Sequence, residues 1–197
     1  MRNLKQRYNY VKEKIKKDTF DLDEEGREIV DLTIIDSDKL ISDYHPDGKA
    51  VIDNEVANVI SNAIKPTSTK RDLLLRIKCE KYTADKETEY KQAITNYYIN
   101  EFADKERKLH NNTIITITLI ISALISFGIL FLFNLTNLPW IIVEMVDIVA
   151  WVFAWEVVDM IFFQRRLIKF EQRQDLKVIF AKIIFSTYEG KKKETTD

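Results

Sequence analysis

Residues 113–133 read TIITITLIISALISFGILFLF, an apolar run without any formal charge. As a helix its 21 residues would span about 32 Å at ~1.5 Å per residue, which matches the hydrocarbon core of a bilayer. Asp, Glu, Lys and Arg make up 31% of the chain, yet none lies between residues 109 and 143. The sequence therefore predicts a membrane protein with soluble flanks.

A second apolar run follows at residues 139–163, after an uncharged polar link at 134–138. It opens with Pro139, which suits a first helical turn, and Trp140, which suits the headgroup level. The two runs predict a two-helix transmembrane hairpin. Basic residues flank only the other two ends, so the positive-inside rule predicts a bacterial inner-membrane protein with both termini cytoplasmic. These residues are Lys105, Arg107, Lys108, Arg165, Arg166, Lys169 and Arg173.

The rest of the composition excludes several classes of protein. The net charge of −1 argues against a strongly basic nucleic-acid binder, and the single cysteine, Cys79, excludes an internal disulfide. The two histidines, His45 and His110, are not in metal-ligand spacing, and only four glycines are available for a phosphate-binding loop. We therefore expect no catalytic residues, no cofactor, no metal site and no enzyme activity.

The flanks predict a small cytosolic α/β domain, which makes the whole chain an α+β membrane protein. Strands are predicted at 28–36 and 73–79, a helix capped by Asp53 runs to Ile64, and a rod-like helix runs from about Ala84 into the first span. A helical stretch at 167–175 precedes a C-terminal strand at 177–188, which we expect to complete the sheet. The predicted parts are a basic helix (1–17), the α/β domain (18–109), the two spans (110–133 and 139–163) and a C-terminal helix, strand and tail (164–197).

Two charged segments at the amino-terminal end have competing interpretations. A basic amphipathic helix at 3–17 could bind anionic lipid or a polyanion, or it could be a solvated helix paired with the acidic stretch that follows. Its cations are Lys5, Arg7, Lys12, Lys14, Lys16 and Lys17. Residues 21–26 begin like a calcium loop, but the twelfth position is Leu32 instead of glutamate, so a turn is expected there.

The second span is unusual because it is acidic. On a helix, Asp147, Trp151, Trp155 and Asp159 form one stripe, with Glu144 inside this arc and Glu156 at its edge. Intramembrane carboxylates usually face a bundle interior, a water-filled path or a partner. The opposite face is apolar and is expected to meet lipid. Its residues are Ile142, Val146, Val149, Phe153 and Met160.

Neither span contains Lys or Arg to neutralise these acids. The first span offers Thr118, Ser122 and Ser126, whose four-residue spacing predicts a packing seam that donates hydrogen bonds to the carboxylates. One hairpin cannot enclose four acidic groups, so we expect a homo-oligomer. Three interpretations remain open: a cation- or proton-conducting path, acids that serve only helix packing, and pairing with a basic span of another protein.

The sequence also carries a resemblance. IVEMVDIVAWVFAWEVVDMIFFQRR, with its tryptophan, Trp-Glu pair, aspartate and aromatics before arginines, resembles an uncharacterised bacterial two-span membrane family, as does the segment 35–60. The family implies no activity. A cytosolic module on a two-span hairpin is similar in architecture to the membrane effectors of antiphage nucleotide signalling, of the CBASS and Hailong types. That resemblance implies an oligomer controlled by a nucleotide or oligonucleotide that a partner enzyme makes.

Two functions follow as hypotheses. In the first, the protein is an oligomeric cation channel or membrane effector that is gated by its cytosolic domain and acts in antiphage defence. In the second, it is a non-conducting membrane scaffold whose cytosolic domain binds a protein partner.

Overall fold

The computed structural model of the chain describes residues 4–17, 21–34, 40–43, 48–68, 70–79, 84–136 and 138–187. The chain divides into two compact units. One, the α/β unit, combines residues 1–99 with 176–197, and the other comprises residues 100–175. The elements are α1 (Leu4–Lys17), β1 (Glu28–Ile34), α2 (Asn54–Ile64), β2 (Leu73–Cys79), α3 (Glu87–Asn134), α4 (Trp140–Asp159), α5 (Arg165–Ile179) and β3 (Lys182–Thr187).

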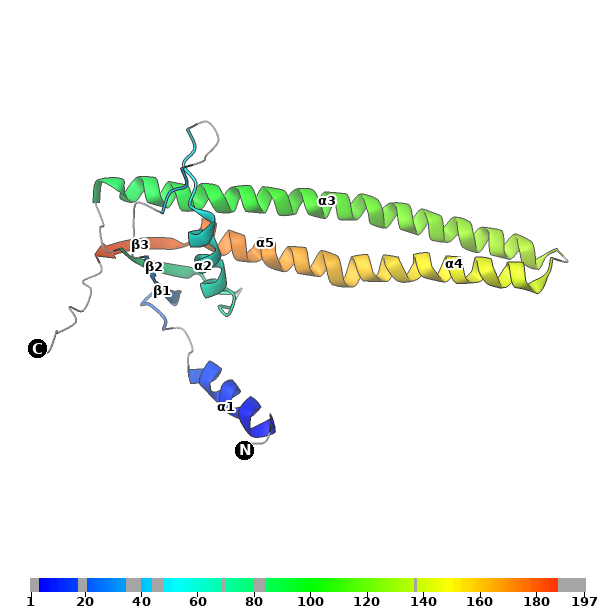
Figure 1. The fold of residues 1–197 in the computed structure, drawn as a ribbon, viewed down its shortest axis with the longest axis horizontal. Coiled ribbons are helices and arrows are strands. Elements are labelled where there is room, and N and C mark those ends of the chain that lie inside the picture. Colours follow the sequence, from blue (N-terminus) through cyan, green and yellow to red (C-terminus); the bar gives the residue numbers. More distant parts are fainter. Residues whose placement is uncertain are drawn as a thin grey trace, which may run out of the picture. The chain divides into compact units, whose positions relative to one another are not determined.

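The sheet has three parallel strands in the order β1-β2-β3 (Figure 1). Glu28 aligns with Leu73 across the first pair, and Leu74 aligns with Lys182 across the second. The expected addition of a C-terminal strand to the amino-terminal sheet is confirmed. Its predicted start at residue 177 is wrong, because α5 continues to Ile179 and the strand begins only at Lys182.

The reason for that error lies in the burial of Val178. This side chain is fully buried in the core from the last turn of α5, so packing favours the helix over the strand that its β-branched neighbourhood suggested. The backbone N–H groups of Phe180 and Ala181 then donate to Leu176 O and Val178 O, which closes the helix. The predicted end of the strand at residue 188 and the predicted tail to residue 197 lie outside the described residues.

The core of the α/β unit lies on one face of the sheet. Alternate residues of β2 are buried, from Leu73 to Cys79, and α2 and the first turns of α3 contribute to the same cluster. The helix α2 begins as expected, with the Asp53 carboxylate accepting the Glu55 N–H at 2.7 Å. Its buried residues are Ala57, Ile60 and Ile64, whereas Val59 is half exposed.

A turn replaces the apparent calcium loop. The Asp23 carboxylate accepts backbone N–H groups from Glu25 and Arg27, and it pairs with the Arg27 guanidinium at 2.6 Å. Gly26 closes the turn with φ +76°, a conformation that favours glycine. The predicted turn is thereby confirmed, and the carboxylate most like a calcium ligand is already occupied.

The long helix α3 is continuous over 48 residues and follows a 3₁₀ turn at Ala84–Lys86, which confirms the predicted rod. It is long and apolar enough to cross a membrane, and among the helices in the described residues only α3 meets that test. The helix α4 starts after Pro139 and has 20 residues, but its four carboxylates set it apart from α3 in composition.

Candidate functional site: the polar groups of the helix pair

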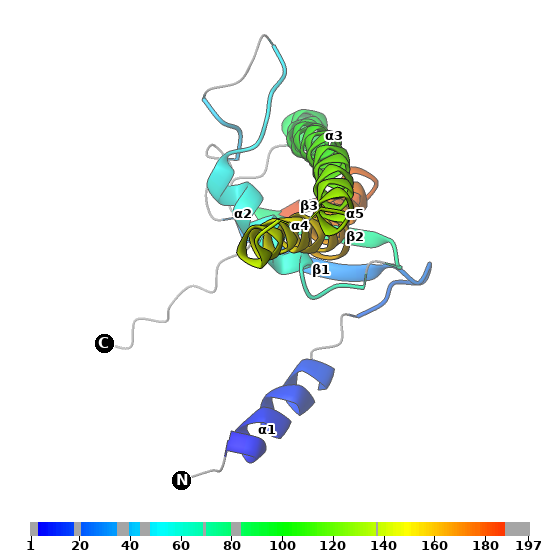
Figure 2. The same cartoon turned by 90° about the vertical axis from the view of Figure 1, so that its right-hand side faces the viewer.

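Residues 100–175 form a helix pair, in which α3 from Asn100 onward runs antiparallel to α4 and α5 (Figures 1 and 2). On the side of α3 that meets its partner, buried and half-buried positions recur at alternating intervals of three and four residues. Buried or half-buried side chains occur at Leu109, Asn112, Thr116, Leu119, Ala123, Ser126 and Leu130. Spacing of this kind is the heptad seam of two helices that pack at a small angle.

The partner seam on α4 is centred on Ala150, which is fully buried. Val146 and Phe153 flank it and are half-buried, and Met160 accepts a hydrogen bond at its Sδ from Asn112 at 2.9 Å. The face that was expected to meet lipid is therefore in large part the face that packs with α3. Only Ile142 and Val149 of that set are exposed.

Most of the acidic arc of α4 consequently lies away from α3. Glu144 and Glu156 are exposed, and Asp147 and Asp159 are half-buried at the edges of the seam. Trp151 and Trp155 are exposed on the same arc, and Trp151 makes an edge-on contact with Phe127 at 6.2 Å between ring centroids. One copy of the helix pair leaves most of the arc uncovered.

Asp159 alone among the four acids has a hydrogen-bond partner in the described part of the chain. Gln164 Nε2 donates to Asp159 Oδ2 at 3.0 Å, and Asn112 Nδ2 donates to Gln164 Oε1 at 3.3 Å. This polar chain links α4 to α3 across a π-helical turn, Met160–Gln164. Single π turns inside helices are common at functional sites, because they widen the helix and re-aim side chains.

Asn112 is only 7% exposed, and its Oδ1 atom lacks a hydrogen-bond partner among the described residues. Thr116, one turn further along the seam, is also buried, and its hydroxyl donates to Asn112 O at 2.7 Å. The prediction missed Asn112, Thr116 and Gln164. The heptad spacing from Leu109 was the signal that could have found the first two.

The hydroxyls of Thr118 and Ser122 do not donate to the carboxylates of α4, although the sequence predicts that they do. Thr118 is exposed and donates to Ile114 O, and Ser122 donates to Thr118 O, both at 3.0 Å. These hydroxyls satisfy carbonyls of their own helix instead of the carboxylates, as Ser and Thr often do in apolar helices. Ser126 does lie in the seam, where it is half-buried.

On the α5 side of the π turn, part-buried polar contacts join α3 to α5. Lys105 Nζ donates to both oxygens of Asp175, at 2.9 and 2.7 Å, and Gln172 donates to Glu106 at 2.7 Å. Burial raises the pKa of the Asp175 carboxyl, and the Lys105 ammonium offsets that effect only in part. Lys105, counted in the sequence only as an orienting cation, is therefore also a packing residue.

A buried ion pair inside the α/β unit was also missed. Lys177 Nζ lies 3.5 Å from Glu28 Oε2 and donates to Thr67 Oγ1 and Ser68 O, at 2.8 and 2.6 Å. Glu28 also accepts the Ser68 N–H at 2.9 Å. Burial lowers the pKa of Lys177, while Glu28 acts in the opposite direction. This network joins the start of β1 to the end of α5, so its role is structural.

The basic amino-terminal helix is present as α1, and its described side chains are exposed, including those of Lys5 and Arg7. For Lys12, Lys14, Lys16 and Lys17 the structure describes the helical backbone and not the side chains. The lipid or polyanion role of this helix stays a prediction.

The described residues contain no group of three or more His, Cys, Asp or Glu side chains placed to hold a metal ion. Comparison of the chain with protein-family models, curated proteins and solved structures finds no match.

Proposed function

We propose that the chain is a bacterial inner-membrane protein in which α3 and α4 both cross the bilayer and both termini are cytoplasmic. The uncharged link at 134–138 and the cations at the opposite ends of the two helices support this orientation. Several copies associate through the acidic arc of α4. The assembled arcs form a cation-conducting path, gated by the α/β unit.

The observation that carries this proposal is the exposure of Glu144 and Glu156 on α4. They have no ion pair or hydrogen bond among the described residues, and residues 109–164 contain no Lys or Arg. A carboxylate that faces lipid in mid-membrane costs about 2.5–3.5 kcal/mol on insertion scales. Since α3 covers the other side of α4, a further copy or a water-filled path is the means of removing that cost.

Gating is proposed to act along α3. This helix is continuous from Glu87, in the α/β unit, to Asn134 at the far end of the pair, with no internal break that would absorb a displacement. By architecture the controlling ligand is a nucleotide or oligonucleotide from a partner enzyme. Antiphage defence is the setting in which such effectors operate.

The test is cation flux into vesicles that contain the purified chain, with and without candidate nucleotides. The variant Glu144→Gln/Glu156→Gln keeps the shape of both side chains and removes their charge. We expect it to lose flux while cross-linking shows an unchanged assembly. Thr118→Val, at an exposed site on α3, is the matched control and should conduct normally.

The second candidate is a non-conducting scaffold, and the hydrogen bond from Gln164 to Asp159 favours it, because that acid serves packing. Under this proposal the glutamine variant changes the oligomeric state, and no nucleotide opens a flux in the original chain. Unchanged flux in a fully assembled glutamine variant would contradict the conducting path.

A further inference from the structure

Four cations without a partner follow the apolar part of α4. Arg165, Arg166, Lys169 and Arg173 are all exposed on α5, and none of the four side chains has an ion pair or hydrogen bond within the described residues. At 100° per residue they fall within about 100° of the helix circumference. The two acids on the same helix, Glu171 and Asp175, fall outside this arc.

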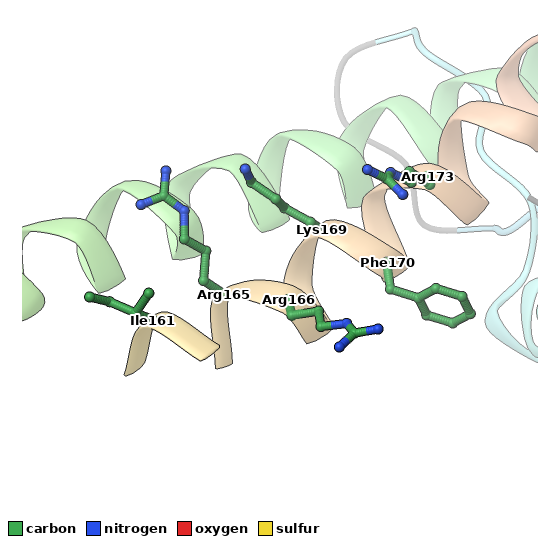
Figure 3. A pocket seen from close by; sticks show the side chains of 6 residues that line it. All are labelled: Ile161, Arg165, Arg166, Lys169, Phe170 and Arg173. Carbon is green, nitrogen blue, oxygen red and sulfur yellow. The ribbon is translucent and has the colours of Figure 1, made fainter. Parts of the chain in front are cut away.

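These cations line a hollow of about 380 Å³ together with Ile161 and Phe170 (Figure 3). Figure 3 shows Arg165 and Lys169 extending on one side of α5 and Arg166 and Phe170 on the other. Arginine binds phosphate through two parallel N–H donors, so Arg165, Lys169 and Arg173, which extend on one side of α5, are suited to a phosphate group.

An apolar groove of about 890 Å³ adjoins this hollow, and the two share Arg166 and Phe170. The groove continues along α4 to Trp155, past Val158 and Phe162. Trp155 lies eleven residues before Arg166, or about 16 Å along a helix, which is close to half of the ~30 Å hydrocarbon core. A cationic hollow at one end and an apolar groove of this length fit a lipid with an anionic headgroup.

We infer that the junction of α4 and α5 is a binding site for an anionic phospholipid, with the phosphate held by Arg165, Lys169 and Arg173 and one acyl chain in the groove that runs from Arg166 toward Trp155. The site rests on the membrane placement of α4 in the proposed function, and it does not require conduction. It is separate from the orienting effect of basic residues, which depends on charge and not on the shape of the donors.

The test uses the full chain with Trp140→Phe and Trp151→Phe, which leaves Trp155 as the only tryptophan. Quenching of its fluorescence is measured in vesicles of phosphatidylcholine and phosphatidylglycerol, with bromine on the acyl chains of one lipid or the other. We expect brominated phosphatidylglycerol to be preferred by about tenfold, since one hydrogen bond to a charged group typically contributes that factor.

Two variants separate phosphate binding from orientation. Arg165→Lys/Arg166→Lys/Arg173→Lys keeps every charge and should lose most of the preference, because it lacks the paired donors. Arg107→Lys, at an exposed arginine of α3 that pairs with Asp104, is the matched control and should leave the preference unchanged.

Three results would overturn the inference. They are equal quenching by the two brominated lipids, a preference that survives in the triple lysine variant, and a preference abolished by soluble glycerol phosphate, which would identify a free phosphate as the ligand. If neither lipid quenches Trp155, α4 does not enter the bilayer, and the proposed function fails together with this site. Equal quenching with intact flux removes the lipid site alone.

Discussion

The α/β unit and the helix pair treat their polar groups in opposite ways. In the α/β unit, the buried Lys177 and Glu28 meet each other and the neighbouring Thr67 and Ser68. In the helix pair, Asn112 Oδ1 has no partner among the described residues, and Glu144 and Glu156 are exposed on a largely apolar helix. A unit that satisfies its own polar groups can be stable alone, whereas one that does not depends on its surroundings.

The largest effect is expected in the core of the α/β unit. Leu75 is fully buried at the middle of the central strand β2, so Leu75→Ala should lower the free energy of unfolding by about 4 kcal/mol through lost burial and a cavity. The rate at which a maleimide labels Cys79 reports opening, since this buried thiol is the only cysteine in the chain. An unchanged labelling rate would show that the strand is not part of a cooperative core.

The next effect tests whether the polar network is structural. Lys177→Met removes one partner of a buried pair and leaves the Glu28 carboxylate with the Ser68 N–H and the distant Arg71, so we expect a loss of about 3 kcal/mol. Cys79 labelling at constant pH measures it. Lys182→Met, at an exposed lysine 3.9 Å from Glu25, is the control and should change stability little. Equal effects of the two changes would refute a special role for Lys177.

A third change bears on the seam of the helix pair. Ala150 has no room for a larger side chain, so Ala150→Leu should destabilise the contact of α3 and α4 by about 2 kcal/mol through overpacking. Val149→Leu, on the exposed side of α4, should have almost no effect. The readout is disulfide formation between cysteines placed at Phe127 and Trp151, in a chain with Cys79→Ala. Equal cross-linking in both variants would place the seam elsewhere.

The α/β unit was largely predictable because its signals are local. The Asp53 cap, the strand at 73–79 and the rod from Ala84 all follow from caps and periodicity within a few residues. The site in the helix pair was less predictable. The same spacing of acidic residues along α4 is compatible with an arc that faces the partner helix and with one that faces away from it. Only the burial of Ala150 and Asn112 decides that, and burial depends on how two distant segments pack.

The smallest effect separates the energy of a charge from that of its hydrogen bonds. Burial raises the pKa of Asp175, and Lys105 offsets this only in part, so the folded helix pair binds a proton more tightly than the unfolded chain. The stability of the pair should then fall as pH rises from the ordinary carboxyl value, 3.8, through the raised value. Asp175→Asn removes that slope. At neutral pH the variant should lie within about 1 kcal/mol of the original chain, because the amide oxygen still accepts from Lys105, Glu101 lies 3.8 Å from the same ammonium, and the desolvation cost of the carboxylate is removed. Unfolding in detergent, followed by circular dichroism at several pH values, gives both curves.

Lys105→Met is the contrasting change, since it leaves the Asp175 carboxylate buried without its ammonium and should destabilise the pair most at neutral pH. If Asp175→Asn were as damaging as Lys105→Met, the pair would be held by the charge of Asp175, and the helix pair would resemble the α/β unit more than its exposed acids suggest.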